Sequence, residues 1–230
     1  MIDVSPTSNQ IHAVTNFEDL VSTSFHGAIN AMYWPRQLTG DFAEIANQIA
    51  LDENIAVLDE EELLALSLSE QGQLAREILL HDLKALKAYG ASPILNIIKC
   101  YERDDSFFPT DVYSFHVDRS PVPTDTFLCT YHGESSEILP NAQALQKILV
   151  PELRDELKKI YQGAAEDFDL FLSEHFFDLH YQAIPNAQPI RLGLGHLWKL
   201  AVDHPESLVL PCVHRAPKEK EGQNRLLMIC

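Results

Sequence analysis

Apolar and polar residues alternate along residues 113–118 (Y-S-F-H-V-D), and this period of two predicts a β-strand with one buried face. His116 and Asp118 lie two residues apart, so a strand places the imidazole and the carboxylate on the same face. They supply two of the three ligands of a 2-His-1-carboxylate site, which binds Fe(II) and leaves coordination positions open. The segment therefore predicts a β fold around a metal centre, with a third ligand from another strand.

The end of the chain offers that ligand. His214 follows an apolar stretch at 208–213 that predicts a strand, and Arg225 opens a second predicted strand at 225–230. The charged, glycine-containing segment between them predicts a hairpin. An Fe(II) oxygenase that uses 2-oxoglutarate needs a fixed cation for the far carboxylate of the cosubstrate. Arginine suits that role because its planar fork binds a carboxylate through two parallel hydrogen bonds.

The rest of the chain predicts an α+β fold. Strands are expected at 28–34, 94–101 and 126–131, and again after Pro185. Apolar residues at helical spacing predict a helix over 73–89, and three more helices are expected within 141–183. We therefore predict one jelly-roll domain over 28–230, with flanking helices and a helical insertion at about 141–183, after an irregular lead-in at 1–27.

Several short motifs carry a resemblance: F-H-V-D-R, L-C-T-Y-H-G, E-I-L-P-N, V-H-R-A-P and R-L-L. The pattern H-x-D, a gap of about a hundred residues and then H-x(10)-R resembles the 2-oxoglutarate/Fe(II)-dependent dioxygenase superfamily, whose fold is a double-stranded β-helix of the cupin-like type. More closely, the motifs look like an uncharacterised bacterial family known only as a domain of unknown function. The resemblance covers residues 94–230 well and 28–230 loosely.

Carried over to this sequence, the resemblance implies that His116, Asp118 and His214 bind iron(II) and that Arg225 anchors 2-oxoglutarate. Thr130 or Tyr131 is expected to hydrogen-bond the cosubstrate. The implied reaction is hydroxylation of a substrate, either a small molecule or a protein.

Two other interpretations stay open at this point. One is a non-catalytic cupin-like protein that binds zinc or another divalent metal for sensing or handling. Cys212 would share a face with His214, and a thiolate ligand would favour zinc. The other is a purely structural jelly roll whose site has decayed.

Charge and composition exclude several classes of function. The formal net charge of −17 argues against binding to nucleic acid or to an anionic membrane surface. No apolar run approaches the roughly 20 residues that cross a bilayer, and the first residues do not form a signal peptide. The four cysteines show no C-x-x-C pairing or disulfide spacing, so a cytoplasmic protein is expected. No P-loop, G-x-G-x-x-G or G-x-S-x-G motif occurs.

Overall fold

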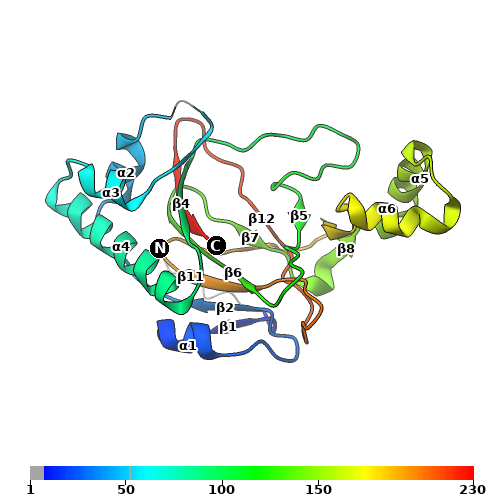
Figure 1. Cartoon of the computed structure of the whole chain (residues 1–230), viewed down its shortest axis with the longest axis horizontal. Coiled ribbons are helices and arrows are strands. Elements are labelled where there is room, and N and C mark those ends of the chain that lie inside the picture. Colours follow the sequence, from blue (N-terminus) through cyan, green and yellow to red (C-terminus); the bar gives the residue numbers. More distant parts are fainter. Residues whose placement is uncertain (1–7, 52) are drawn as a thin grey trace.

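The computed structural model describes residues 8–51 and 53–230 and has an α+β architecture with two sheets (Figure 1). The first sheet holds, in spatial order, β1 (Ile11–Ala13), β2 (Ala31–Trp34), β11 (Leu197–Ala201), β6 (Asp125–His132), β13 (Arg225–Ile229), β4 (Ile94–Ile98) and β3 (Ile55–Val57). The second holds β10 (Ile190–Arg191), β7 (Glu137–Ile138), β12 (His214–Arg215), β5 (Phe115–His116), β9 (His180–Ala183) and β8 (Ala144–Gln146). β1 and β2 pair in parallel, and the other named strands among the described residues pair antiparallel.

The chain passes repeatedly from one sheet to the other. β4 and β6 lie in the first sheet, whereas β5 and β7 lie in the second; β11 and β13 return to the first, whereas β10 and β12 belong to the second. Strands that are far apart in sequence thus become neighbours, in the orders β4-β13-β6-β11 and β5-β12-β7-β10. This topology is consistent with a β-sandwich or jelly roll.

β6 is buried on both faces because it lies between two layers of core. Leu128 packs in the cluster between the sheets, with Trp198 and Leu227 of the first sheet and Ile138 of the second. The neighbouring residue Cys129 points the other way, into a cluster that includes residues of α2 and α4. A strand covered on both faces has a nearly continuous apolar sequence, as T-F-L-C-T-Y does here.

The helices α1 (Phe17–Ser22), α2 (Phe42–Gln48), α3 (Glu60–Ala65) and α4 (Glu70–Tyr89) pack outside the first sheet (Figure 1). The predicted helix over 73–89 is confirmed within α4, which begins one turn earlier. Ser69 caps its start by accepting a hydrogen bond from the Gly72 amide, and Gly90 ends it with a φ of 104°. None of the described helices is long and apolar enough to cross a bilayer.

The segment 141–183 differs from the three helices expected there. It contains two α-helices, α5 (Pro151–Ile160) and α6 (Phe168–Glu174), which project from one end of the sheets (Figure 1). The first of the three expected helices is missing: over 141–149, two short 3-10 turns flank strand β8 (Ala144–Gln146), which pairs with β9. Pairing with the edge of the sheet overrides the weak helical pattern of this stretch.

The predicted lead-in contains two short regular elements where the structure describes it. Residues 1–7 lie outside the described residues, and β1 and α1 lie within 8–27. β1 adds a parallel strand beside β2, with Ile11 opposite Ala31. Asn16 caps α1 by accepting a hydrogen bond from the Asp19 amide at 2.8 Å.

Candidate metal centre

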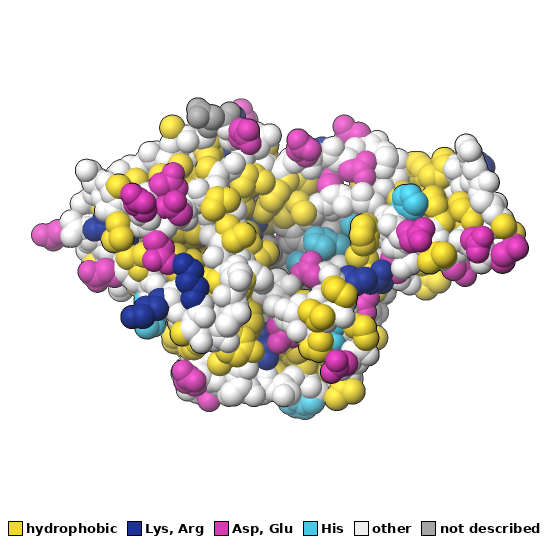
Figure 2. Space-filling view, in the orientation of Figure 1, with side chains coloured by type: hydrophobic (Ala, Val, Ile, Leu, Met, Phe, Trp, Pro, Cys, Tyr) yellow, Lys and Arg dark blue, Asp and Glu magenta, His cyan; other side chains and the backbone are white. Residues whose placement is uncertain are grey.

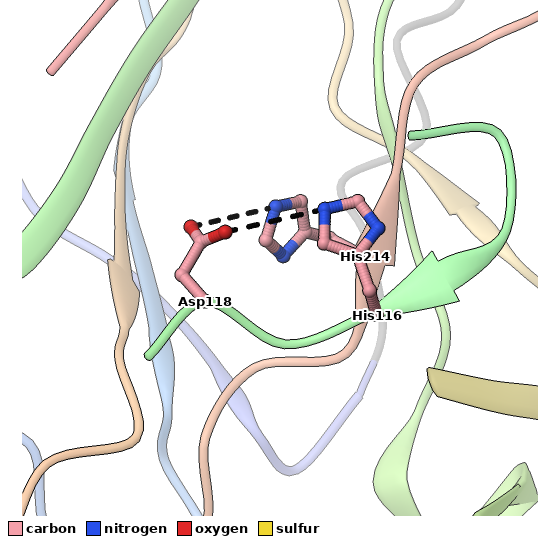
Figure 3. Close-up of side chains that lie close together, drawn as sticks. All are labelled: His116, Asp118 and His214. Atoms are coloured by element: carbon pink, nitrogen blue, oxygen red, sulfur yellow. Dashed lines mark ion pairs between the residues drawn. The ribbon is translucent and has the colours of Figure 1, made fainter. Parts of the chain in front are cut away.

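Two short strands of the second sheet place the histidines side by side. His214 of β12 is the direct antiparallel partner of His116 of β5, and their ring centroids are 4.6 Å apart. Asp118 follows β5 and turns back toward both rings (Figure 3). A direct cross-strand pair points its side chains to the same face, so strand pairing alone brings these two ligands together.

The carboxylate lies between the two imidazoles. The Nε2 atom of His214 is 3.7 Å from Oδ2 of Asp118, and Nε2 of His116 is 4.0 Å from Oδ1 (Figure 3). One potential ligand atom from each of the three residues lies within 4.8 Å of the others. Thr126 donates a hydrogen bond of 2.5 Å to Oδ2 of Asp118, which fixes the carboxylate from β6 of the other sheet. The geometry is that of a 2-His-1-carboxylate triad.

Backbone carbonyl groups orient both rings. Nδ1 of His116 lies 2.8 Å from the carbonyl oxygen of Ser114, and Nδ1 of His214 lies 3.1 Å from that of Cys212. A carbonyl oxygen only accepts, so in the neutral form of each ring Nδ1 carries the proton and Nε2 keeps a free lone pair directed toward Asp118. Hydrogen bonds of this kind, made by the ring nitrogen that does not face the metal, hold metal-binding imidazoles in position.

Electrostatics favour the protonation states that a metal requires. Burial and the adjacent His214 lower the pKa of His116 to about 4, so this imidazole is neutral at pH 7. Burial by itself would raise the pKa of Asp118, but interaction with His214 and the hydrogen bond from Thr126 lower it below its ordinary value. His116 and Asp118 therefore have the protonation states in which they can bind a divalent ion.

Arg225 is the most unusual side chain near this site. It is only 1% exposed, and it donates to Ser136 Oγ at 2.8 Å, Thr130 Oγ1 at 3.1 Å and the Tyr101 hydroxyl at 3.5 Å. Its Nε has no hydrogen-bond partner, and no carboxylate of the described residues forms an ion pair with it. Burial lowers its pKa, although interactions with the Tyr101 hydroxyl and the Glu219 carboxylate oppose this effect. A buried guanidinium whose hydrogen-bond partners are all hydroxyls could accept an anion as an ion-pair partner.

Sheet geometry relates Arg225 to the triad. Its partner Ser136 lies two residues before Ile138, which is the direct cross-strand partner of His214. Ser136 is therefore a diagonal neighbour of His214, and such pairs lie about 7–8 Å apart. A short dicarboxylate can span this distance.

The hairpin predicted at the end of the chain is wrong. His214 begins strand β12 in the second sheet, whereas Arg225 begins β13 in the first, so the intervening loop crosses the sandwich. The two residues reach the site from facing sheets, which still brings them to the same interior. Gly133, with a φ of 87°, lies against this start of β13: a Cβ there would be 3.0 Å from the Arg225 Cα.

Thr130 and Tyr131 point to opposite faces of β6, so at most one of them can contact the cosubstrate. Thr130 faces Arg225, as described above. Tyr131 instead donates a 2.6 Å hydrogen bond to Asp82 of α4 and stacks on Phe42 of α2, on the helical side of the sheet. Of the two alternatives, the geometry therefore favours Thr130, because the ring of Tyr131 is part of the outer core.

Ser136 and Tyr101 were missed from the sequence, and Cys212 does not join the site. Ser136 stands on the segment before β7 and Tyr101 just beyond β4, so only the tertiary fold brings them to Arg225. Cys212 is fully buried in the cluster between the sheets, and burial raises the pKa of its thiol. It is absent from the group of potential ligands found among the described residues.

Figure 2 shows that this face of the molecule is hollowed near its centre, with histidine and acidic side chains inside the hollow and hydrophobic side chains around it. Comparison with protein-family models, with curated proteins and with solved structures gives no match for this chain. Fold and site geometry therefore define the class here: a two-sheet α+β protein with a His-Asp-His triad between its sheets.

Proposed function

We propose that the protein is an iron(II)- and 2-oxoglutarate-dependent oxygenase that hydroxylates a substrate bound beside the triad. One observation carries the proposal: Arg225 of the facing sheet donates to Ser136, a diagonal neighbour of the triad residue His214, and is buried without an ion-paired carboxylate among the described residues. A buried arginine with a purely structural role would need a counter-ion to offset the cost of its desolvation. An arginine that anchors an anionic cosubstrate receives its counter-ion on binding.

The donor set fits the proposed group. Two imidazoles and one carboxylate, with both Nε2 atoms free, match the ligands that non-haem Fe(II) oxygenases use. His116, Asp118 and His214 would hold the iron. Iron and 2-oxoglutarate, when bound, supply the activation of dioxygen.

The side chains of this protein would have three tasks. The carbonyl groups that accept from the two imidazoles keep both rings in the metal-binding tautomer. Arg225, with the hydroxyls of Ser136 and Thr130, would bind the distal carboxylate of 2-oxoglutarate through charge-assisted hydrogen bonds. The apolar residues between the sheets keep bulk water from the site, which strengthens these interactions.

We also infer that the two sheets form a double-stranded β-helix of the cupin-like type. Eight strands in the orders β4-β13-β6-β11 and β5-β12-β7-β10 support this assignment. The triad would then occupy the open interior of the sandwich, with two ligands from adjacent strands and the anchor from the facing sheet.

A cytoplasmic location and a small-molecule or protein substrate belong to the same proposal. The four cysteines are all free thiols, which fits a reducing compartment. The net charge of −17 is unsuited to nucleic acid as a substrate.

Anaerobic titration tests the reaction class. Metal-free protein is loaded with one equivalent of Fe(II), and 2-oxoglutarate is added while the visible spectrum is recorded. A weak charge-transfer band is expected with 2-oxoglutarate but not with glutarate, which lacks the 2-oxo group, and not in Asp118→Ala. Admission of oxygen should then produce succinate slowly, even without substrate.

The same titration separates the enzyme from a non-catalytic metal-binding protein. Such a protein would use the triad but would have no need of Arg225. Stoichiometric zinc binding, with neither the band nor succinate, would overturn the oxygenase and favour metal sensing or handling.

A further inference from the structure

The row of side chains that includes the two histidine ligands continues past them along the second sheet. His180 of β9 is the direct cross-strand partner of His116, just as His214 is its partner on the other side. Direct partners share a face, so His180 points into the same interior as the triad. The ring centroids of His116 and His180 are 6.0 Å apart.

His180 has no function in the proposed metal site, yet it is buried. It is 6% exposed, and its Nδ1 has no hydrogen-bond partner in the part of the chain that the structure describes. Phe108 lies edge-on to its ring, with centroids 6.5 Å apart. A buried polar atom without a partner costs stability unless a ligand satisfies it.

Lys147 brings a positive charge close to His180. It begins the 3-10 turn after β8, and its Nζ lies 5.0 Å from the ring centroid of Phe108, the same ring that lies edge-on to His180. Its Nζ donates to Ser114 Oγ at 2.6 Å and to the Pro109 carbonyl at 2.8 Å. An ammonium group has three donors, so one remains for a ligand.

No carboxylate neutralises Lys147 directly. It forms no ion pair within 4.0 Å among residues 8–51 and 53–230. Asp104 and Asp111 act on it only through space, and their oxygens already accept backbone amide hydrogens of the 104–114 loop. Asp104 and Asp111 therefore leave the Lys147 ammonium available for another anion.

We propose that His180 and Lys147 form the subsite that binds the substrate, and that the substrate is a small carboxylic acid held through its carboxylate. The subsite lies on the β9 side of the triad, opposite the Arg225 side, so cosubstrate and substrate would approach the metal from different directions. Phe108 and Phe177, whose rings are 5.0 Å apart, form an apolar wall nearby for the rest of the acid. This role in hydroxylation rests on the proposed oxygenase function, whereas carboxylate binding does not.

Ligand-detected NMR on the purified protein tests the subsite. The probes are butanoate, hexanoate and 3-phenylpropanoate, each compared with its primary amide. Metal-free wild-type protein should bind at least one of the carboxylates. Its affinity for the corresponding amide should be lower by about 10-fold or more, because a hydrogen bond to a charged group is lost. Mn(II) bound at the triad should broaden the signals of the bound acid.

Variants locate the binding. Lys147→Met and His180→Leu should each weaken carboxylate binding about 10-fold or more. Lys158→Met and His175→Leu, which alter an exposed lysine and an exposed histidine of the same insertion, should bind as wild type does. If His180→Leu does not fold, His180→Gln is measured in its place, because glutamine is polar and keeps a hydrogen-bonding group at this position.

Three results would overturn the subsite: no preference for carboxylates over amides, unchanged binding in both Lys147→Met and His180→Leu, or no broadening by Mn(II) that elemental analysis shows to be bound and that His116→Ala fails to bind. All measurements are repeated in Arg225→Met, so that binding at the cosubstrate anchor is not mistaken for the subsite. Carboxylate binding that depends on Lys147 without any 2-oxoglutarate binding would leave the subsite standing and reject the oxygenase. Binding of 2-oxoglutarate without binding of any probe carboxylate would reject the subsite and leave the oxygenase standing.

Discussion

Replacement of Arg225 by methionine separates the cosubstrate anchor from the metal site. Methionine retains an unbranched apolar side chain but removes the guanidinium, which is 1% exposed and bonded to Ser136 and Thr130. Truncating one partner of a buried charge-assisted pair costs about 2–5 kcal/mol of binding free energy. At about 1.4 kcal/mol per decade, the Kd for 2-oxoglutarate should rise about 30-fold or more. Arg225→Lys should restore only part of the affinity, because an ammonium cannot form the planar fork.

Calorimetric titration measures this effect. The protein is loaded with Mn(II), which does not activate oxygen with 2-oxoglutarate, and is then titrated with the cosubstrate. Mn(II) affinity should be nearly unchanged in Arg225→Met, since Arg225 is not a ligand. Arg191→Met is the matched control: Arg191 is 70% exposed and pairs with Glu134 at the surface.

The same variant has an expected effect on stability. Arg225 forms no ion pair with the described carboxylates, so its removal relieves the cost of a buried charge. We expect the unfolding free energy of Arg225→Met without cosubstrate to stay near that of wild type, as measured by chemical denaturation. Wild-type affinity for 2-oxoglutarate in Arg225→Met would refute the anchor and leave the metal-binding protein as the better hypothesis.

Three further outcomes are expected. His116→Ala or Asp118→Ala should abolish stoichiometric metal binding in elemental analysis, because two remaining ligands rarely hold a labile ion; full occupancy in both would contradict the triad. Asp82→Ala should lower the unfolding free energy by about 3–5 kcal/mol, since it leaves the buried guanidinium of Arg36 without its 2.7 Å partner, and a loss near zero would show that the pair is dispensable. The Asp104 carboxyl should titrate at about 2 by NMR, because backbone amides of its loop stabilise the ionised form. The stabilisation is present above the ordinary pKa of about 4 and is lost as the pH falls toward 2, so Asp104→Asn should remove this pH dependence.

The sequence by itself determined the elements that depend on local pattern. Alternation along 113–118 predicts that His116 and Asp118 share one face of a strand. In the structure β5 ends at His116, so the path of the chain after the strand also brings Asp118 to the ring. The helical spacing of Ala75, Leu79 and Leu83 is enough to predict most of α4. Both signals arise within a few residues and need no knowledge of distant neighbours.

The tertiary structure decided how distant segments meet. Strand register, which no local pattern reports, places His214 and His180 on either side of His116. The crossing loop before β13 puts Arg225 in the facing sheet and not in a hairpin, and residues at 130 and 136 complete its surroundings. The tertiary structure also decides which of Thr130 and Tyr131 faces the site. β6 is buried on both faces, so its apolar sequence does not indicate which face is turned toward the second sheet. Pairing between distant strands therefore determines how the site residues lie relative to one another, whereas short-range periodicity predicts only the individual elements that carry them.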